Sequence, residues 1–226
     1  LPAVVAQDDI LILVLQSSQQ NLATPASYTQ LGPQNGIGAA AAAGSTRLGI
    51  FWKRAGASES APTITDSGDH TYGVMFTVRG CPTTGDPFRM IGQAWKFTAS
   101  TTGTAAAGRT TVPNSLVVSI FAQAIDAASA QGSSPTNASL TSVTEVFDSG
   151  TADGTGGGIY VMSGVAVDPT PVTAGTVTWG SSTVDVSTTI AFIPEDAFAI
   201  ARNPEVWTFI GGPPNLDDTW TKPSGA

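Results

Sequence analysis

Short apolar runs separated by Gly, Pro, Ser, Thr and Asn dominate the chain. The run 10–15 is continuously apolar, which predicts a strand buried on both faces. In the run 184–193, Val184, Val186 and Ile190 alternate with polar residues, which predicts a strand with one apolar face. The expected strands are 10–15, 28–31, 47–54, 72–79, 91–98, 116–122, 140–147, 159–167 and 184–193.

The spacing of these runs predicts an all-β fold. No amphipathic helical pattern lies between them, so the helical crossovers of a parallel α/β sheet are not expected. Short strands at regular spacing with turn signals favour an antiparallel two-sheet sandwich, jelly-roll-like in type. The segments 33–45 and 149–158, both rich in glycine, are expected to be a loop and a long turn.

The character of the sequence changes after Pro194. We therefore expect a β-sandwich domain over 1–194, followed by an extended Pro-rich C-terminal arm or linker over 195–226. Isolated aromatic residues in this arm are the candidates for an interface with another subunit. A linker whose tryptophans fold back onto their own domain is the alternative. The interface candidates are Trp207, Phe209 and Trp220.

Composition and charge exclude several classes of partner. Only 12% of the 226 residues are charged, and the formal net charge is −8. An acidic chain with scattered Lys and Arg has no electrostatic footprint for nucleic acid or anionic lipid, and no apolar run is long enough to span a bilayer. One Cys and one His exclude an internal disulfide framework and multi-histidine metal chemistry, so no metal or cofactor is expected.

The ionisable residues give little support to catalysis, and we expect no enzyme and no catalytic residue. His70 is the only candidate base, and Asp69 beside it is poorly placed to orient its ring. There is no G-x-S-x-G nucleophile elbow. We therefore expect His70 to be a surface residue. Cys81, between Gly80 and Pro82, is expected to be a semi-buried structural thiol rather than the partner of His70.

The carboxylates fall mostly in turns. A glycosidase needs two acids that converge across a cleft, whereas Asp favours turns through side-chain to backbone hydrogen bonds. The 148–153 loop could hold calcium with backbone carbonyls, although it lacks the ligand order of a calcium loop. The acids considered are Asp66 and Asp69, Asp148 and Asp153, and Asp217 and Asp218.

Aromatic residues allow a carbohydrate-binding alternative. The strand 51–54 interleaves aromatic and basic residues, although alternate residues of such a strand are more simply explained as core. A carbohydrate-binding module or lectin would need an exposed aromatic platform. The candidates for that platform are Trp52, Trp95 and Trp179.

Several segments together resemble virion structural proteins of tailed bacteriophages. The apolar strand after an acidic turn (7–14) is followed by TPASYTQLG (24–32), which is similar to a P-x-G-[WY]-T-x-L-G pattern with Ser27 at the glycine position. Next come TRLGIFWKRA (46–55) and a strand that ends in Arg-Gly (73–80). The closing TWTKPSGA (219–226) resembles the opening of glycine-rich domains in phage tail-fibre and appendage proteins.

This resemblance implies a β-sandwich structural protein on the surface of a phage virion. Such proteins are commonly trimers whose arms wrap their neighbours, so a homotrimer that contacts other virion subunits is expected. The role implied is that of a fibre or appendage in particle assembly and host attachment, with a host surface glycan as a possible ligand. A capsid decoration (cement) protein that stabilises the head is the alternative. Further chain before Leu1 and a distal domain after Ala226 are also expected.

Overall fold

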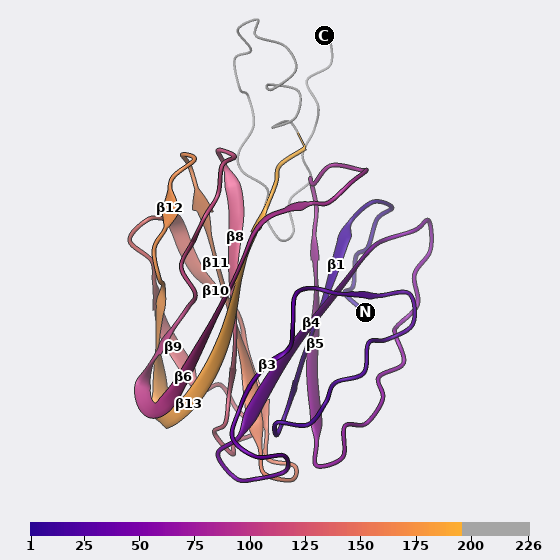
Figure 1. The fold of residues 1–226 in the computed structure, drawn as a ribbon. Coiled ribbons are helices and arrows are strands. Elements are labelled where there is room, and N and C mark those ends of the chain that lie inside the picture. The colour runs from indigo at the N-terminus through magenta and orange to yellow at the C-terminus, as the bar shows by residue number, and fades with distance from the viewer. Residues whose placement is uncertain (196–226) are drawn as a thin grey trace, which may run out of the picture.

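Two large antiparallel sheets packed face to face form most of the described part of the protein, as seen in the computed structural model (Figure 1). The structure describes residues 1–195, without the side chain of Met90. All secondary structure in this part of the chain is strand, which confirms the all-β sandwich predicted from the sequence. The proposed arm and its candidates Trp207, Phe209 and Trp220 lie outside the described residues.

The first sheet is built from the N-terminal part of the chain. Its strand order is β2-β4-β1-β5, with β3 also paired to β4. Its central strand β1 pairs with β4 on one side and β5 on the other. All of its residues are buried, because both faces of this strand are covered. The strands are β1 (Ile10–Ser17), β2 (Thr29–Gln30), β3 (Asn35–Ile37), β4 (Thr46–Arg54) and β5 (Thr71–Val78).

The second sheet is built from the remaining described residues, in the order β10-β11-β8-β13-β6. Strand β9 pairs with the N-terminal half of β13, and β7 with β12 forms a separate short ribbon. The strands are β6 (Phe88–Thr104), β7 (Gly108–Arg109), β8 (Ser115–Gln123), β9 (Gly132–Thr136), β10 (Thr141–Thr151), β11 (Gly157–Ala166), β12 (Pro171–Val172) and β13 (Thr176–Phe192).

The main core lies between the two sheets. Alternate residues of β1 meet alternate residues of β8 and β13, because successive side chains of a strand point to opposite faces. Among the buried residues are Ile10, Ile12, Val14, Val118, Ile120, Val186, Ile190 and Phe192. The opposite face of β1 is also buried, under Leu22, Phe51 and neighbouring loops. This confirms the prediction that the first apolar run is covered on both sides.

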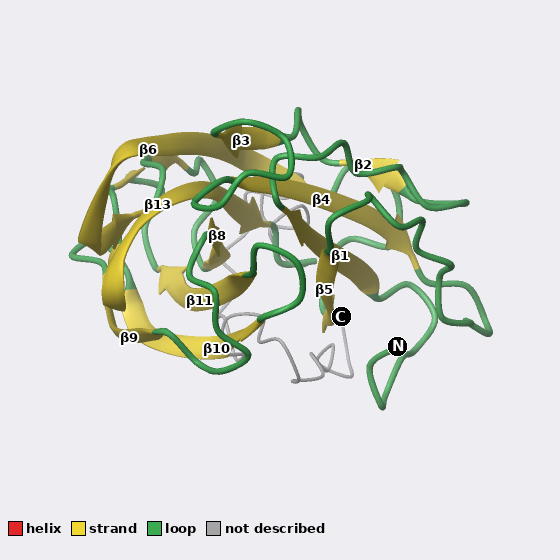
Figure 2. Cartoon of the chain, turned by 90° about the horizontal axis from the view of Figure 1, so that it is seen from below, coloured by secondary structure: helices red, strands yellow, loops and turns green. Residues whose placement is uncertain are grey.

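A second core arises because the second sheet curls. Figure 2 shows β6 and β13 curving around β8 and β11 towards β9 and β10. Register shifts in the β6–β13 pair, between Thr178 and Thr183, accompany this bend. The curl covers a buried aromatic cluster of Phe121, Tyr160 and Trp179, whose ring centroids lie 5.8–6.2 Å apart in edge-to-face contacts.

The structure also corrects the sequence predictions in detail. Strand β3 lies within 33–45, which was expected to be only a loop, and β7, β9 and β12 were not predicted. Strand β6 extends far beyond the predicted 91–98. On β13 the polar residues Ser187 and Thr189 were expected to face solvent, but they are buried. The oxygen of Thr189 lies 3.0 Å from that of Ser119, so these hydroxyls satisfy each other.

Ser27, which stands where the resembling pattern has glycine, has a left-handed backbone conformation. Its φ is +67°, in the left-handed region that glycine occupies most readily. The turn is closed by a hydrogen bond from the Tyr28 N–H to the Pro25 carbonyl at 3.1 Å. The turn therefore forms with serine at the position where the resembling pattern has glycine.

Candidate functional site

An exposed apolar stripe on β6 is the most unusual surface of the described protein. Ile91, Trp95 and Phe97 are 44%, 45% and 73% exposed. Ile91 pairs with Ile190 and Trp95 with Val186, and both β13 residues point into the main core. Ile91 and Trp95 are therefore on the core-facing side of the sheet, yet solvent reaches them. We call Ile91, Trp95 and Phe97 the β6 stripe.

The β6 stripe is uncovered because the first sheet ends before it. The loop before β3 reaches only the beginning of the stripe, where a Cβ on Gly32 would lie 3.7 Å from the Ile91 side chain. The Gln93 amide donates to the Pro33 carbonyl at 2.6 Å and to the Asn35 side chain, and so closes this corner. Trp95 and Phe97 lie further along the strand, past the cover.

Strand β6 is also an edge strand. β13 pairs with one side of it, and no other strand of residues 1–195 is hydrogen-bonded to the other side. A long edge with unpaired backbone groups is a template for another strand, and natural proteins usually cover or charge such edges. A further strand with apolar side chains could pair with the free edge of β6 and cover the β6 stripe.

The three candidate tryptophans do not form an exposed platform. Trp179 is 2% exposed, at the centre of the second core, and its indole N–H donates to the Asp185 carboxylate at 3.2 Å. Trp52 packs edge-to-face on Phe88, with ring centroids 5.0 Å apart, at the margin of the main core. Only Trp95 is well exposed, so the aromatic platform expected for a lectin is wrong for this set of residues.

His70 is buried in a polar cluster and is not the expected surface residue. It is 6% exposed, and its Nδ1 lies 2.8 Å from Asp69 Oδ2, so the neighbouring carboxylate does orient the ring, contrary to the sequence prediction. Its Nε2 lies 2.9 Å from the Gln16 amide oxygen. Both ring nitrogens are thus engaged, and the position where a serine nucleophile would lie is occupied by an amide.

The same cluster joins the two sheets. The Asp69 carboxylate accepts hydrogen bonds from the N–H and the hydroxyl of Thr155, both at 2.9 Å, and Thr155 lies in the β10–β11 turn. The Thr155 hydroxyl also contacts the Ser18 hydroxyl at 2.7 Å. Hydrogen bonds from Thr155 and His70 hold the pKa of Asp69 below its usual value. This arrangement closes one end of the sandwich.

Cys81 cannot pair with His70. The two residues flank β5 at its opposite ends, so they are separated by roughly 26 Å of strand. The Cys81 side chain is buried, as predicted for a structural thiol, and desolvation raises its pKa to about 12. A protonated thiol is a poor nucleophile at neutral pH.

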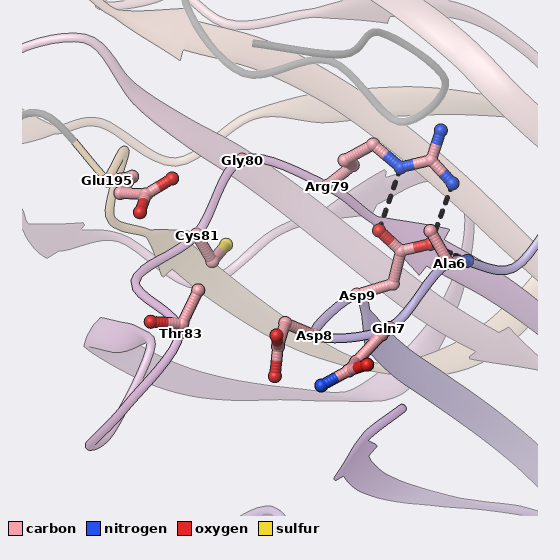
Figure 3. A pocket seen from close by; sticks show the side chains of 9 residues that line it. All are labelled: Ala6, Gln7, Asp8, Asp9, Arg79, Gly80, Cys81, Thr83 and Glu195. Carbon is pink, nitrogen blue, oxygen red and sulfur yellow. Dashed lines mark hydrogen bonds and ion pairs between the residues drawn. The ribbon is translucent and has the colours of Figure 1, made fainter. Parts of the chain in front are cut away.

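A cavity of about 190 Å³ lies beside Cys81, where β1 begins and the described chain ends (Figure 3). Arg79 and Asp9, which both line it, form a bidentate ion pair with both nitrogen–oxygen distances 2.8 Å. The Glu195 N–H donates to the Gly80 carbonyl at 2.8 Å, which fixes the exit of the chain at this rim. The Arg79–Asp9 pair and the backbone contacts join strand ends, which is a structural role.

The other candidate carboxylates make contacts within turns or between neighbouring strands, while Asp217 and Asp218 lie outside the described residues. Asp66 accepts from the Gly68 N–H at 2.9 Å, the turn contact expected for aspartate, and Asp153 accepts from the Thr151 hydroxyl at 3.1 Å. Asp148 accepts from the Gly132 N–H at 2.6 Å and so holds β9 beside β10. No group of three His, Cys, Asp or Glu side chains is arranged to hold a metal ion within residues 1–195.

Asp185 was not singled out by sequence reasoning. It is buried in the middle of β13, opposite Lys96 of β6. Desolvation raises its pKa to about 6, although the Trp179 hydrogen bond and the Lys96 charge act in the opposite direction. The sequence signal was an acid within an apolar strand, which alternation alone assigns to the solvent face.

The described part of the chain contains no helix with the length and apolarity needed to cross a membrane. Comparisons with protein-family models, with curated proteins and with solved structures each found no match.

Proposed function

We propose that this chain is a structural protein of a phage-like virion, part of a fibre or appendage that contributes to particle assembly and host attachment. The resemblance of the segments 7–14, 24–32, 46–55 and 219–226 to phage virion proteins supports this proposal. The turn geometry at Ser27 is compatible with it, because the pattern places glycine at that position.

The observation that carries the proposal is the β6 stripe. Monomeric proteins seldom leave neighbouring large apolar side chains exposed along one strand, and such a surface is typical of a contact with another protein. At the end of the sandwich near His70, hydrogen bonds between hydroxyl, amide and carboxylate groups join the two sheets. A well-closed fold with one exposed apolar strand favours a structural subunit that contacts other subunits.

The chemistry of the described residues points the same way. The only histidine has both ring nitrogens engaged, and the only cysteine is buried and protonated. In this proposal the partners are other virion subunits, with the chain itself as a homotrimer, and the place of action is the particle surface. In this proposal the ligand for host attachment is a glycan on the host surface.

Labelling of particles tests the proposal. Antibodies raised against the 226-residue chain would be applied to virus-sized particles purified from the source culture, and bound gold would be located by electron microscopy. Gold on tails or fibres is the expected result. Gold spread over the head would favour the capsid decoration role over the fibre role. Particles without gold would contradict both roles.

A further inference from the structure

We propose that the free edge of β6 accepts residues 206–210 from a second copy of this chain as an additional antiparallel strand, with Trp207 and Phe209 covering the β6 stripe. The acceptor is the surface defined above: an unpaired strand edge beside Ile91, Trp95 and Phe97. Strand addition of this kind combines main-chain hydrogen bonds with side-chain contacts on alternate residues.

The donor is chosen by its sequence. Residues 206–210 read Val-Trp-Thr-Phe-Ile, all of them β-branched or aromatic, which is the composition most favoured in strands. In an extended strand Trp207 and Phe209 share one face, at the same spacing as Trp95 and Phe97. Aromatic side chains that face each other on neighbouring strands stabilise a sheet, so Trp207 and Phe209 are suited to contact Trp95 and Phe97.

The geometry of the chain favours a second copy over the same copy. The described chain leaves the fold beside the start of β6, where the Ile193 N–H donates to the Pro87 carbonyl at 3.0 Å. Every described strand pair is antiparallel. An antiparallel addition must therefore enter at the Phe97 end, roughly 30 Å along β6 from its start.

Within one chain, residues 196–205 would have to span that distance and then reverse direction. Fully extended, they reach at most about 35 Å, which leaves too little chain for the reversing turn. A parallel addition within one chain would fit the length but would differ from all the strand pairs of residues 1–195, which are antiparallel. A donor from a neighbouring copy has neither restriction.

The inference deepens the proposed function only in the contact between copies. It needs no virion, since it concerns purified chains. If particles carry no gold but copies exchange residues 206–210, the virion assignment fails and the strand addition stands. If particles are labelled but no exchange occurs, the reverse is true.

Cross-linking between introduced cysteines tests the proposal. The cysteines are placed on the opposite strand face from Trp95, Trp207 and Phe209, so these aromatic side chains are unchanged. T98C and T208C would be made in separate full-length chains with different tags, co-expressed, and treated with a short bismaleimide. Thr98 is exposed, and native Cys81 is buried with a raised pKa, so Cys81 should not react. We expect a cross-linked species that contains both tags.

The matched control is T144C in place of T98C, because Thr144 is an exposed threonine on β10, the opposite edge of the same sheet. The T98C–T208C yield should exceed the control at least about tenfold, since pairing raises the local concentration of the two thiols. Replacing Trp207 and Phe209 by serine in the T208C chain should reduce the yield to the control level.

Three results would overturn the proposal. The first is equal yield with T98C and T144C. The second is cross-linking within a chain that carries both T98C and T208C, with none between the two tagged chains. The third is a wild-type chain that remains monomeric by light scattering at every concentration.

Discussion

Trp95 and Trp179 come from two strands that pair with each other, yet they lie in opposite environments. Trp179 is enclosed by Phe121 and Tyr160 where the second sheet curls over itself. Trp95 stands on the stretch of β6 that the first sheet does not reach, and it is 45% exposed. The two regions differ in whether another layer of chain covers them.

This difference shows that strand pairing and coverage are separate requirements. Trp95 and Trp179 belong to the same pair of hydrogen-bonded strands, β6 and β13. Strand pairing therefore does not explain why Trp179 is buried and Trp95 is exposed. Coverage of Trp179 comes from this chain, whereas coverage of Trp95 would have to come from outside residues 1–195. Substitutions in the two regions should therefore affect different properties.

The largest effect is expected for Trp179→Ala. Removing a fully buried indole from the second core should lower the free energy of unfolding by about 4 kcal/mol, because a cavity remains and contacts with Phe121 and Tyr160 are lost. Urea unfolding of the full chain measures this value. A loss below about 1 kcal/mol would mean that the curled part of the sheet contributes little to the fold.

Asp185→Asn should remove a pH dependence. Because the folded-state pKa of about 6 lies above the unfolded value, the wild type binds a proton more tightly when folded and should gain stability as the pH falls from 7 to 4. The shift corresponds to about 3 kcal/mol. Asparagine keeps an acceptor for the Trp179 N–H and has no charge to bury, so the variant should be the more stable at pH 7.

The measurement is urea unfolding of wild type and Asp185→Asn at several pH values between 4 and 8. Lowered carboxylate pKa values elsewhere, as at Asp69, act in the opposite sense below about pH 4 and are common to both proteins. The difference between the two curves therefore isolates Asp185. Parallel curves across this range would show that Asp185 stays charged in the fold.

His70→Ala tests a region closed by polar contacts. It deprives the buried Gln16 amide oxygen and the Asp69 carboxylate of their contacts with the ring, so a loss of about 2 kcal/mol in unfolding free energy is expected at pH 7. Asp66→Ala is the control, since Asp66 lies in the same loop and accepts a local turn hydrogen bond from the Gly68 N–H. Equal losses in both variants would contradict a special role for the cluster.

The smallest effect on folding is expected for Trp95→Ala. A half-exposed side chain with no covering layer should contribute less than about 1 kcal/mol to the unfolding of an isolated copy. At high concentration the same variant should weaken association, which light scattering measures. Val167→Ala, at a similarly exposed apolar residue, should leave association unchanged. A loss as large as that of Trp179→Ala would mean that Trp95 belongs to the core.

The sequence predicted the fold class and most strands because their signal is local. Apolar runs such as 10–15 and 116–122 specify buried strands whatever they pair with. The short strands β3 and β9 were missed because Asn-Gly-Ile and a Ser-Pro-Thr segment have no apolar pattern and become strands only through their neighbours. Register and tertiary contacts decide such segments.

The candidate site was harder to predict for the same reason. Alternation places Trp95 and Phe97 on one face of a strand, but it cannot tell where the opposing sheet stops. Likewise, the contact of Asp69 with Thr155 joins segments far apart in the sequence, so His70 gave no sign of burial. Both features depend on the packing of the two sheets.

Hydrogen–deuterium exchange of the full-length chain at low and high concentration tests the central claim most directly, namely that the β6 stripe is an unfinished surface completed by another copy. We expect protection to increase with concentration in peptides from 88–97 and 203–212, while peptides from β1 and β8 remain equally protected. Unchanged exchange in 88–97, with new protection on another surface, would contradict the account.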